Sequence, residues 1–155
     1  MAGWTTYDIA VRDKRSWQHA GEEHSRRHLN QRKSIDLRGF THRNPIPAAC
    51  RLGPLLMSGS ILPRHADGTS PATLDEQCAL MFRYVREIME QAGGTTDHIV
   101  KVNVAMKDAS EREVLNKHWV TMFPDSATRP ARHTETKDLP GNILVQCDIV
   151  AVIGE

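Results

Sequence analysis

The sequence predicts an α+β domain in which two helices cover one face of a mixed β-sheet. Two segments carry apolar residues at the spacing of a helix, and the segments around them show the alternation of strands. The chain has 155 residues and 39% hydrophobic side chains, enough for one domain with one core. The predicted order is two strands, a helix, a strand, a helix and two strands, with no repeat longer than one helix and one strand.

A change in composition at residues 44–47, Asn-Pro-Ile-Pro, marks the predicted start of this domain. Residues 11–43 hold nine Lys or Arg and four Asp or Glu, a net charge of +5, and few large apolar residues. We therefore expect residues 1–43 to be a basic N-terminal extension, partly helical, and residues 44–155 to be the folded domain. His24 and His28 would share a helical face in the extension, but no third ligand is evident, so surface histidines are favoured over a metal site.

The first elements of the domain are a predicted strand and a predicted helix. Residues 52–59, LGPLLMSG, form an apolar run that we interpret as a buried strand ending at Ser58 and Gly59. Thr73 and Glu76 have the spacing of a capping box, and Gly93 ends the helix. The apolar face of this helix consists of Leu74, Cys78, Met81, Val85, Ile88 and Ala92.

A second strand and helix follow. Residues 99–106, IVKVNVAM, alternate as a strand, with the valines and Met106 on one face. Ser110 and Glu113 form another capping-box pattern, and the helix ends before Pro124. Its predicted buried face consists of Leu115, Trp119, Met122 and Phe123.

Two strands complete the predicted sheet. Residues 131–137 alternate so that Arg132 lies on one face, while His133 and Glu135 lie on the other. Residues 143–153 place apolar side chains at odd positions, with Gln146 and Asp148 on the opposite face. The sheet face without helices is therefore partly polar and partly apolar, which predicts that it associates with other subunits.

Composition narrows the classes of partner. The net charge of +1 gives no overall field that would attract nucleic acid or an anionic membrane, so a small ligand is favoured. No run of about 18 apolar residues indicates a membrane span, and the first residues lack the apolar core of a signal peptide. The three cysteines have no metal-ligand spacing and suit reduced thiols in the cytoplasm.

Arg132 is the strongest candidate for a ligand-binding residue. It follows Pro130 at the start of a strand, and its planar guanidinium can donate two parallel hydrogen bonds to a carboxylate or phosphate. The alternative is a solvated surface arginine. Ser58 lies at a strand end, but no histidine is placed as its base, so a positioning role is favoured over a nucleophile. The sequence has no phosphate-binding loop, dinucleotide-binding glycine motif or zinc-protease motif.

Several segments in collinear order resemble the reactive intermediate deaminase A (RidA, YjgF-type) family. They are LGPLLMSGSILP, a helix ending in EQAGG, DHIVKVNVAMKDASEREVLNKHWVTMF and RPARHTETKDLPGNILVQCDIVAV, which together span about residues 44–153. The resemblance implies a chorismate-mutase-like α+β fold, a homotrimer and a site in each cleft between subunits. It also implies hydrolysis of small carboxylated imines and enamines, such as 2-aminoacrylate and 2-iminopropionate, to 2-oxo acids and ammonia. This chemistry needs no metal or other cofactor.

The resemblance carries over to individual residues. Arg132, in Pro-Ala-Arg-His, takes the position of the arginine that binds the substrate carboxylate. Ser58 and Gly59 match the Ser-Gly pair at the pocket, and Asn116 matches an asparagine of the second helix. The glutamate that holds the attacking water in the family is Gln146 here, and an amide can orient water but cannot take its proton.

Other departures concern the substrate range. The family's Gly-Pro-Tyr is Asn-Pro-Ile at residues 44–46, and His133 replaces a serine or threonine. We expect an imine deaminase with Arg132 as the anchor, Ser58 and Gly59 positioning the substrate, and Gln146 orienting water; Asp148 is a conjectural substitute for the missing carboxylate. Alternatives are a specialised enamine deaminase of the 2-aminomuconate type, a non-catalytic ligand-binding trimer, and an endoribonuclease, which has support only from the basic extension.

Overall fold

The computed structural model describes residues 31–40, 42 and 44–154 of the chain. All of these residues except Gln31 belong to a compact unit that runs from Arg32 to Glu155. His24, His28 and the predicted helical part of the extension lie outside the described residues. The longer elements are the strands β1 (Lys33–Ile35), β2 (Ala49–Leu52), β3 (Leu55–Ser58), β4 (Ile99–Met106), β5 (Ala131–Thr136) and β6 (Val145–Val152) and the helices α2 (Leu74–Gln91) and α3 (Arg112–Met122).

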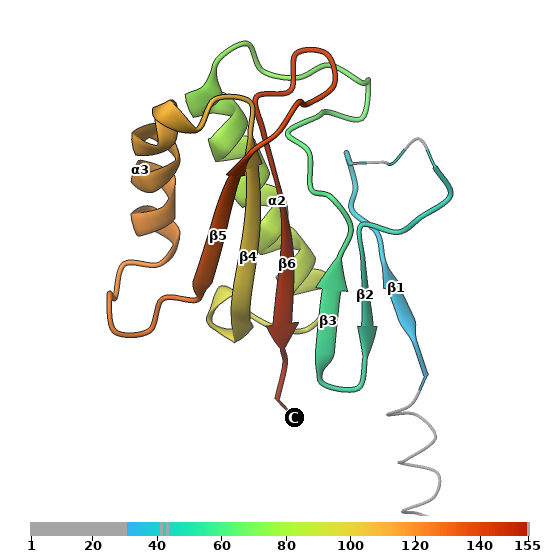
Figure 1. Ribbon diagram of the computed structural model, residues 1–155. Helices are drawn as coiled ribbons and strands as arrows, with labels where there is room; N and C mark the ends of the chain where they lie inside the picture. The colour runs from blue at the N-terminus through green and yellow to red at the C-terminus, as the bar shows by residue number, and fades with distance from the viewer. Residues whose placement is uncertain (1–30, 41, 43, 155) are drawn as a thin grey trace, which may run out of the picture. The chain divides into compact units, whose positions relative to one another are not determined.

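The strands form one mixed sheet with the order β1-β2-β3-β6-β4-β5. The pairing is antiparallel throughout except between β4 and β5, which are parallel. Figure 1 shows α2 crossing behind the middle of the sheet and α3 beside β5. The predicted α+β architecture, two helices on one face of a mixed sheet, is confirmed.

The sheet begins earlier than the change in composition indicated. β1 pairs with β2, and Ile35, Leu37 and Phe40 are buried in the core. The compact unit therefore starts at Arg32, not at residue 44. A short edge strand needs few apolar residues, and three are enough to attach this basic segment to the sheet.

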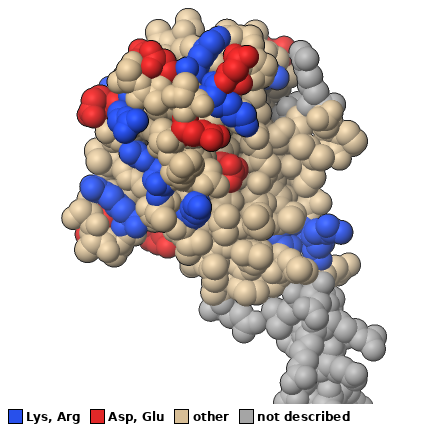
Figure 2. All heavy atoms as spheres, viewed as in Figure 1, with Lys and Arg blue, Asp and Glu red and all other residues tan. Residues whose placement is uncertain are grey.

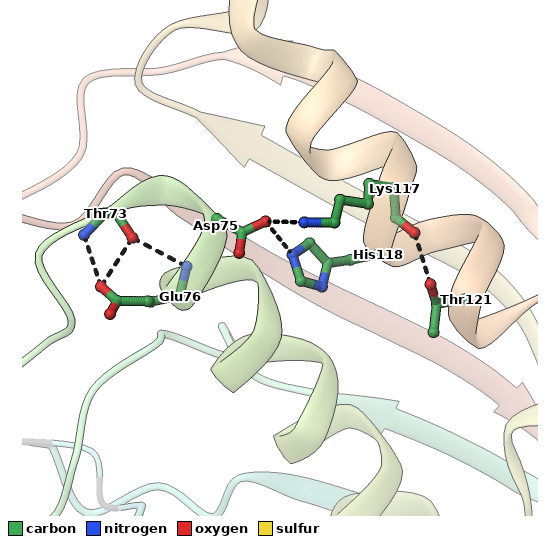
Figure 3. Close-up of polar contacts among 6 residues, drawn as sticks. All are labelled: Thr73, Asp75, Glu76, Lys117, His118 and Thr121. Carbon is green, nitrogen blue, oxygen red and sulfur yellow. Dashed lines mark hydrogen bonds and ion pairs between the residues drawn. The ribbon is translucent and has the colours of Figure 1, made fainter.

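Helix α2 has the start that the sequence predicted, and its buried surface is wider than the predicted face. Thr73 Oγ1 accepts a hydrogen bond from the backbone N–H of Glu76, and the Glu76 carboxylate accepts from the N–H of Thr73 (Figure 3). Asp75, in the same turn, lies 3.0 Å from both Lys117 Nζ and His118 Nε2 of α3, so polar contacts also join the two helices. All six residues predicted for the apolar face are buried, and so are five that were not predicted: Gln77, Leu80, Phe82, Tyr84 and Met89.

Helix α3 starts differently from the prediction. The Asp108 carboxylate accepts from the N–H of Ser110 and caps a short 3₁₀ turn, Ala109–Glu111, so α3 begins only at Arg112. The predicted capping box at Ser110 and Glu113 is therefore wrong, because an aspartate two residues earlier satisfies the free N–H group first. The four residues predicted for its buried face are buried.

Two strands depart from the predicted alternation. β4 has a bulge between Ile99 and Lys101, which turns Ile99 into the core and leaves Val100 48% exposed. β3 is not buried on both faces, because only Leu56 points into the core while Leu55 and Met57 are 42% and 51% exposed. β6 alternates as predicted, with Val145, Cys147, Ile149 and Ala151 buried.

The sheet face without helices, which we call the open face, has an apolar half and a polar half. Cross-strand pairing places Leu52, Leu55, Met57 and Val152 together on its apolar half. Figure 2 shows an uncharged surface there, whereas Lys and Arg mixed with Asp and Glu cover the part toward β4, β5 and α3. None of the helices in the described part of the chain is long and apolar enough to cross a membrane.

Candidate functional site

Arg132 lies in a cage formed by β5 and α3. Its register partner Val102 is buried beneath the helices, so the Arg132 side chain also points toward the helix layer. Its Nη2 donates to Asn116 Oδ1 at 2.8 Å, and the guanidinium carbon lies 4.8 Å from the centre of the Trp119 ring. We call these three residues the arginine cage. The structure thus brings together two of the predicted site residues, Arg132 and Asn116.

The guanidinium of Arg132 in the arginine cage has a hydrogen-bond donor that no described residue uses. Asn116 donates to Glu113 Oε1 at 3.2 Å, which turns the amide oxygen toward Arg132. Burial, followed by the nearby charge of Arg112, lowers the pKa of Arg132, although an arginine remains protonated at neutral pH. Arg132 Nη1 is buried and has no hydrogen-bond partner among the described residues. A buried donor without an acceptor costs about 1–3 kcal/mol, so a carboxylate oxygen would complete this site.

Ser58 and Gly59 lie where the pairing of β3 with β6 is interrupted. The ladder runs to Met57 and Val150 and resumes as a single bridge between Ile61 and Cys147. Within the gap, Ser58 Oγ accepts from the backbone N–H of Ile149 at 2.9 Å, in place of a backbone carbonyl. The Ser58 hydroxyl is therefore a structural acceptor, and the next two residues leave the sheet.

Gly59 is closely surrounded by backbone and by a histidine. A Cβ at this position would lie 3.4 Å from His42 Nε2 and 3.7 Å from the carbonyl oxygen of Pro47. His42 also lines a neighbouring cavity of about 410 Å³. The lining of that cavity is Ser34, Asp36, Leu37, Phe40, His42, Asn44, Pro45, Ile46, Pro47 and Ala48. Among the described lining residues the titratable groups are Asp36 and His42, and the sequence indicated neither as a site residue.

Gln146 lies on the polar half of the open face, beside a small cavity of about 100 Å³ that we call the open-face cavity. The polar residues that line it are Ser60, Asn103, His133, Glu135, Lys137, Gln146 and Asp148. Asn103 Nδ2 donates to Asp148 Oδ1 at 2.8 Å, which fixes that carboxylate. Ser60 connects this cavity to the Ser58 and Gly59 segment.

A single chain does not assemble all the predicted site residues. Arg132 and Gln146 lie on opposite faces of the sheet. Ser58 lies on β3, which is separated from β5 by β6 and β4, a distance of about 14 Å at the usual strand spacing. The structure therefore contains two half-sites: the arginine cage, and the open-face cavity with the Ser58–Ser60 segment.

The cysteines offer no reactive group at either half-site. Burial raises the pKa of Cys78 to about 12 and raises the pKa of Cys147 further above its ordinary range. Such thiols remain protonated and act as small apolar side chains. Within residues 31–40, 42 and 44–154, no cluster of three or more His, Cys, Asp or Glu has the arrangement of a metal site.

Comparison with known proteins gives one consistent result. The family model described as Endoribonuclease L-PSP matches residues 46–153. A RutC family protein of Aquifex aeolicus is 36% identical over 101 residues, 64% of this chain and 81% of the relative. A RutC family protein of Haemophilus influenzae is 31% identical over 112 residues, 70% of this chain and 86% of the relative.

Solved structures share the fold. The RidA structure from an Antarctic Psychrobacter superposes with a TM-score of 0.72 at 23% identity, covering 78% of this chain and 99% of that chain. The YjgF gene product of Escherichia coli gives a TM-score of 0.70 at 25% identity, covering 77% and 98%. Each of these two superpositions covers a larger share of this chain than the family model, which matches residues 46–153. This difference is expected if the segment containing β1 belongs to the common fold.

Proposed function

The chain belongs to the Endoribonuclease L-PSP family, the RidA and YjgF family that its sequence resembles, and we propose that it is an imine deaminase. The proposed substrates are small imines and enamines that carry a carboxylate, of the 2-aminoacrylate or 2-iminopropionate type. The proposed products are the 2-oxo acid and ammonia. No cofactor is needed in this proposal, because a protonated imine is already electrophilic.

The observation that carries the proposal is the unsatisfied Nη1 of Arg132 in the arginine cage. Nη2 is held by Asn116 and the guanidinium plane rests on Trp119, so the cation is oriented before a ligand arrives. A fixed guanidinium with a free donor suits a carboxylate better than a neutral group. A carboxylate anchored there would place the adjacent imine carbon at a constant distance from the cage.

We propose that a homotrimer completes the site. The arginine cage lies near the β5 edge, whereas Gly59 and its neighbouring cavity lie toward the β1 edge. A head-to-tail contact between subunits would join the two different edges and, with a three-fold rotation, close into a ring. Such a ring would also cover the exposed Leu52, Leu55, Met57 and Val152 on the open face. Gln146 would then orient water toward a substrate held by a neighbouring Arg132.

Specific observations bear on the alternatives. Asp36 lines the cavity beside His42, and its carboxylate would repel a second carboxylate on a substrate, so a 2-aminomuconate-type acid is disfavoured at this cavity. A non-catalytic ligand-binding trimer is favoured by the amide at Gln146. An endoribonuclease would need a basic track for phosphates, but acidic side chains are mixed among the basic ones on the face seen in Figure 2.

Two variants test the deaminase proposal. Imines are generated in situ from several amino acids, and release of 2-oxo acid and ammonia is followed for the wild type, Arg132→Ala and Arg86→Ala. Arg86 is exposed on α2, a helix that contributes no residue to either half-site, and controls for the loss of a charge. We expect acceleration by the wild type and the Arg86 variant and a loss of at least about 100-fold with Arg132→Ala, as for removal of a charged anchor.

The purified wild-type protein also tests the proposed trimer. Sedimentation of the wild-type protein is expected to give three times the chain mass. Carboxylate binding without any turnover would support the ligand-binding trimer instead.

The three free cysteines suit a reducing compartment, and we propose that the protein is located in the cytoplasm. Fractionation of the source cells tests this location. One relative, from Schizosaccharomyces pombe, is named as mitochondrial, which makes that measurement worthwhile.

A further inference from the structure

Glu135 is a carboxylate at the open-face cavity that the family resemblance did not single out. In the sheet register, Ala105 of β4 pairs with Glu135 of β5 on one side and with Gln146 of β6 on the other. The three residues therefore lie in one row across the sheet with their side chains on the same face. The middle residue is an alanine whose methyl group packs against Leu139 and Ile143, and the cavity beside this contact is lined by both longer side chains.

The open-face cavity connects these two side chains. Glu135 and Gln146 both line it, together with Ser60, and its volume of about 100 Å³ has room for more than one water molecule. The Cα atoms of Glu135 and Gln146 are two strand spacings apart, about 10 Å, so a water molecule between their extended side chains can contact both. An amide on one side and a carboxylate on the other can together hold a water molecule and accept its proton.

Glu135 is better placed for this task than the other carboxylate at the cavity. Asp148 already accepts a hydrogen bond from Asn103 at 2.8 Å, in the neighbouring row that also contains His133. The Glu135 carboxylate has no hydrogen bond or ion pair with another described residue, although Lys137 lines the same cavity. Of the two carboxylates at this cavity, Glu135 is therefore the one that is free to accept a proton from water.

From this geometry, and on the basis of the proposed deaminase function, we propose that Glu135 is the general base that takes the proton of the water oriented by Gln146. The water oxygen bonds to the carbon of the protonated imine while one water proton passes to the Glu135 carboxylate and the C=N π electrons become a lone pair on nitrogen. The resulting carbinolamine then receives that proton on nitrogen. Its C–N bond breaks as the hydroxyl proton passes to the Glu135 carboxylate and the C=O bond forms, and the released ammonia takes that proton from Glu135, so the imine cation and water give the 2-oxo acid and ammonium.

The test removes the carboxylate at position 135 and introduces one at position 146, on the other side of the cavity. Steady-state rates on in situ imines are compared for the wild type, Glu135→Gln, Gln146→Glu and the double variant Glu135→Gln with Gln146→Glu. Removal of a general base typically lowers kcat by about 100-fold or more, and we expect this for Glu135→Gln. Gln146→Glu is expected to stay active, and in the double variant it should restore kcat to within about 10-fold of the wild type, because either position can supply the base to the same water.

The pH profile gives a readout that a merely structural role would not change. The acidic limb of kcat/KM should disappear in Glu135→Gln and return in the double variant. The charged or titratable groups that line the cavity with Glu135 are His133 from β5, Lys137 just after β5 and Asp148 from β6, while the lining residues of β4 carry no charge. Glu90→Gln, an exposed glutamate at the far end of α2, is the matched control and should behave as the wild type.

The outcomes separate the inference from the proposed function. If the wild type is active and Arg132→Ala is not, but Glu135→Gln keeps full activity and the acidic limb, the role of Glu135 is overturned and the deaminase function stands. Failure of Gln146→Glu to rescue a correctly folded Glu135→Gln protein, checked by its thermal unfolding, also overturns it. If the wild type accelerates no imine, both the deaminase function and the role of Glu135 are rejected.

Discussion

Gln77 provides a quantitative test of how the fold supports the open-face cavity. Its side chain is completely buried in α2, and three hydrogen bonds fix it. Nε2 donates to the carbonyl oxygens of Pro71 and Asn142 at 2.9 and 2.8 Å, and Oε1 accepts from the N–H of Leu144 at 2.8 Å. One side chain thus joins the helix to the loop before it and to the segment that leads into β6.

Replacing Gln77 with leucine keeps the volume but removes all three bonds. Each backbone group left without a partner costs about 1 kcal/mol at the low end of the usual range, so we expect a loss of about 3 kcal/mol in the free energy of unfolding. That is roughly a 100-fold change in the folded-to-unfolded ratio. Because Leu144 lies two residues before Gln146, the variant should also lose activity.

Urea unfolding measures this effect directly. The midpoint should fall with an unchanged m-value, since the surface exposed on unfolding stays the same. Gln91→Leu, at the exposed end of α2, is the matched control and should lie within about 0.5 kcal/mol of the wild type. If Gln77→Leu and Gln91→Leu have equal stability, the three hydrogen bonds of Gln77 do not stabilise the fold.

Two further variants test local features of the fold. Thr73→Ala removes the cap of α2 and should cost about 1 kcal/mol by thermal or urea unfolding, whereas Thr121→Ala, whose hydroxyl only returns to the Lys117 carbonyl, should cost nothing (Figure 3); equal losses would contradict the capping role. Burial lowers the pKa of His42 below 6.5 despite the opposing charge of Asp36, so the folded state resists protonation and the free energy of unfolding should decrease as the pH falls through 6.5. His42→Asn should remove this part of the pH dependence and the exposed His65→Asn should keep it; the opposite pattern would refute the assignment.

The proposed site takes residues from several strands, and one strand supplies residues to both half-sites. Arg132 and Glu135 are three positions apart in β5, so alternation sends them to opposite faces of the sheet. One faces the helix layer at the arginine cage, and the other faces the open-face cavity. A single strand would thus contribute its anchor to one cleft of the proposed trimer and its base to another. Variants at the two positions in different subunits could complement each other in mixed trimers.

Local patterns in the sequence determined the elements and their buried faces. Helical spacing predicted the buried face of α3 and six buried residues of α2, and alternation placed Gln146 and Asp148 opposite the core of β6, because each side-chain direction follows from backbone geometry alone. Spacing did not predict that α2 is buried on further sides, where Tyr84 donates to the carbonyl oxygens of Gly39 and Arg64. The same alternation separated Arg132 from Glu135 and His133. It could not foresee the bulge at Val100 or the early 3₁₀ turn at Asp108, which depend on competition between neighbouring backbone partners.

Only the tertiary structure decided which distant residues meet. Strand order set Ala105 between Glu135 and Gln146, placed Trp119 and Asn116 around Arg132, and brought Gln77 to the carbonyl of Asn142, 65 residues away. It also added the basic segment at β1 to the sheet, although its composition resembles an appendage. Pairing between strands joins residues that are remote in sequence, and the free energy that selects it comes from the burial of the whole core rather than from any local pattern.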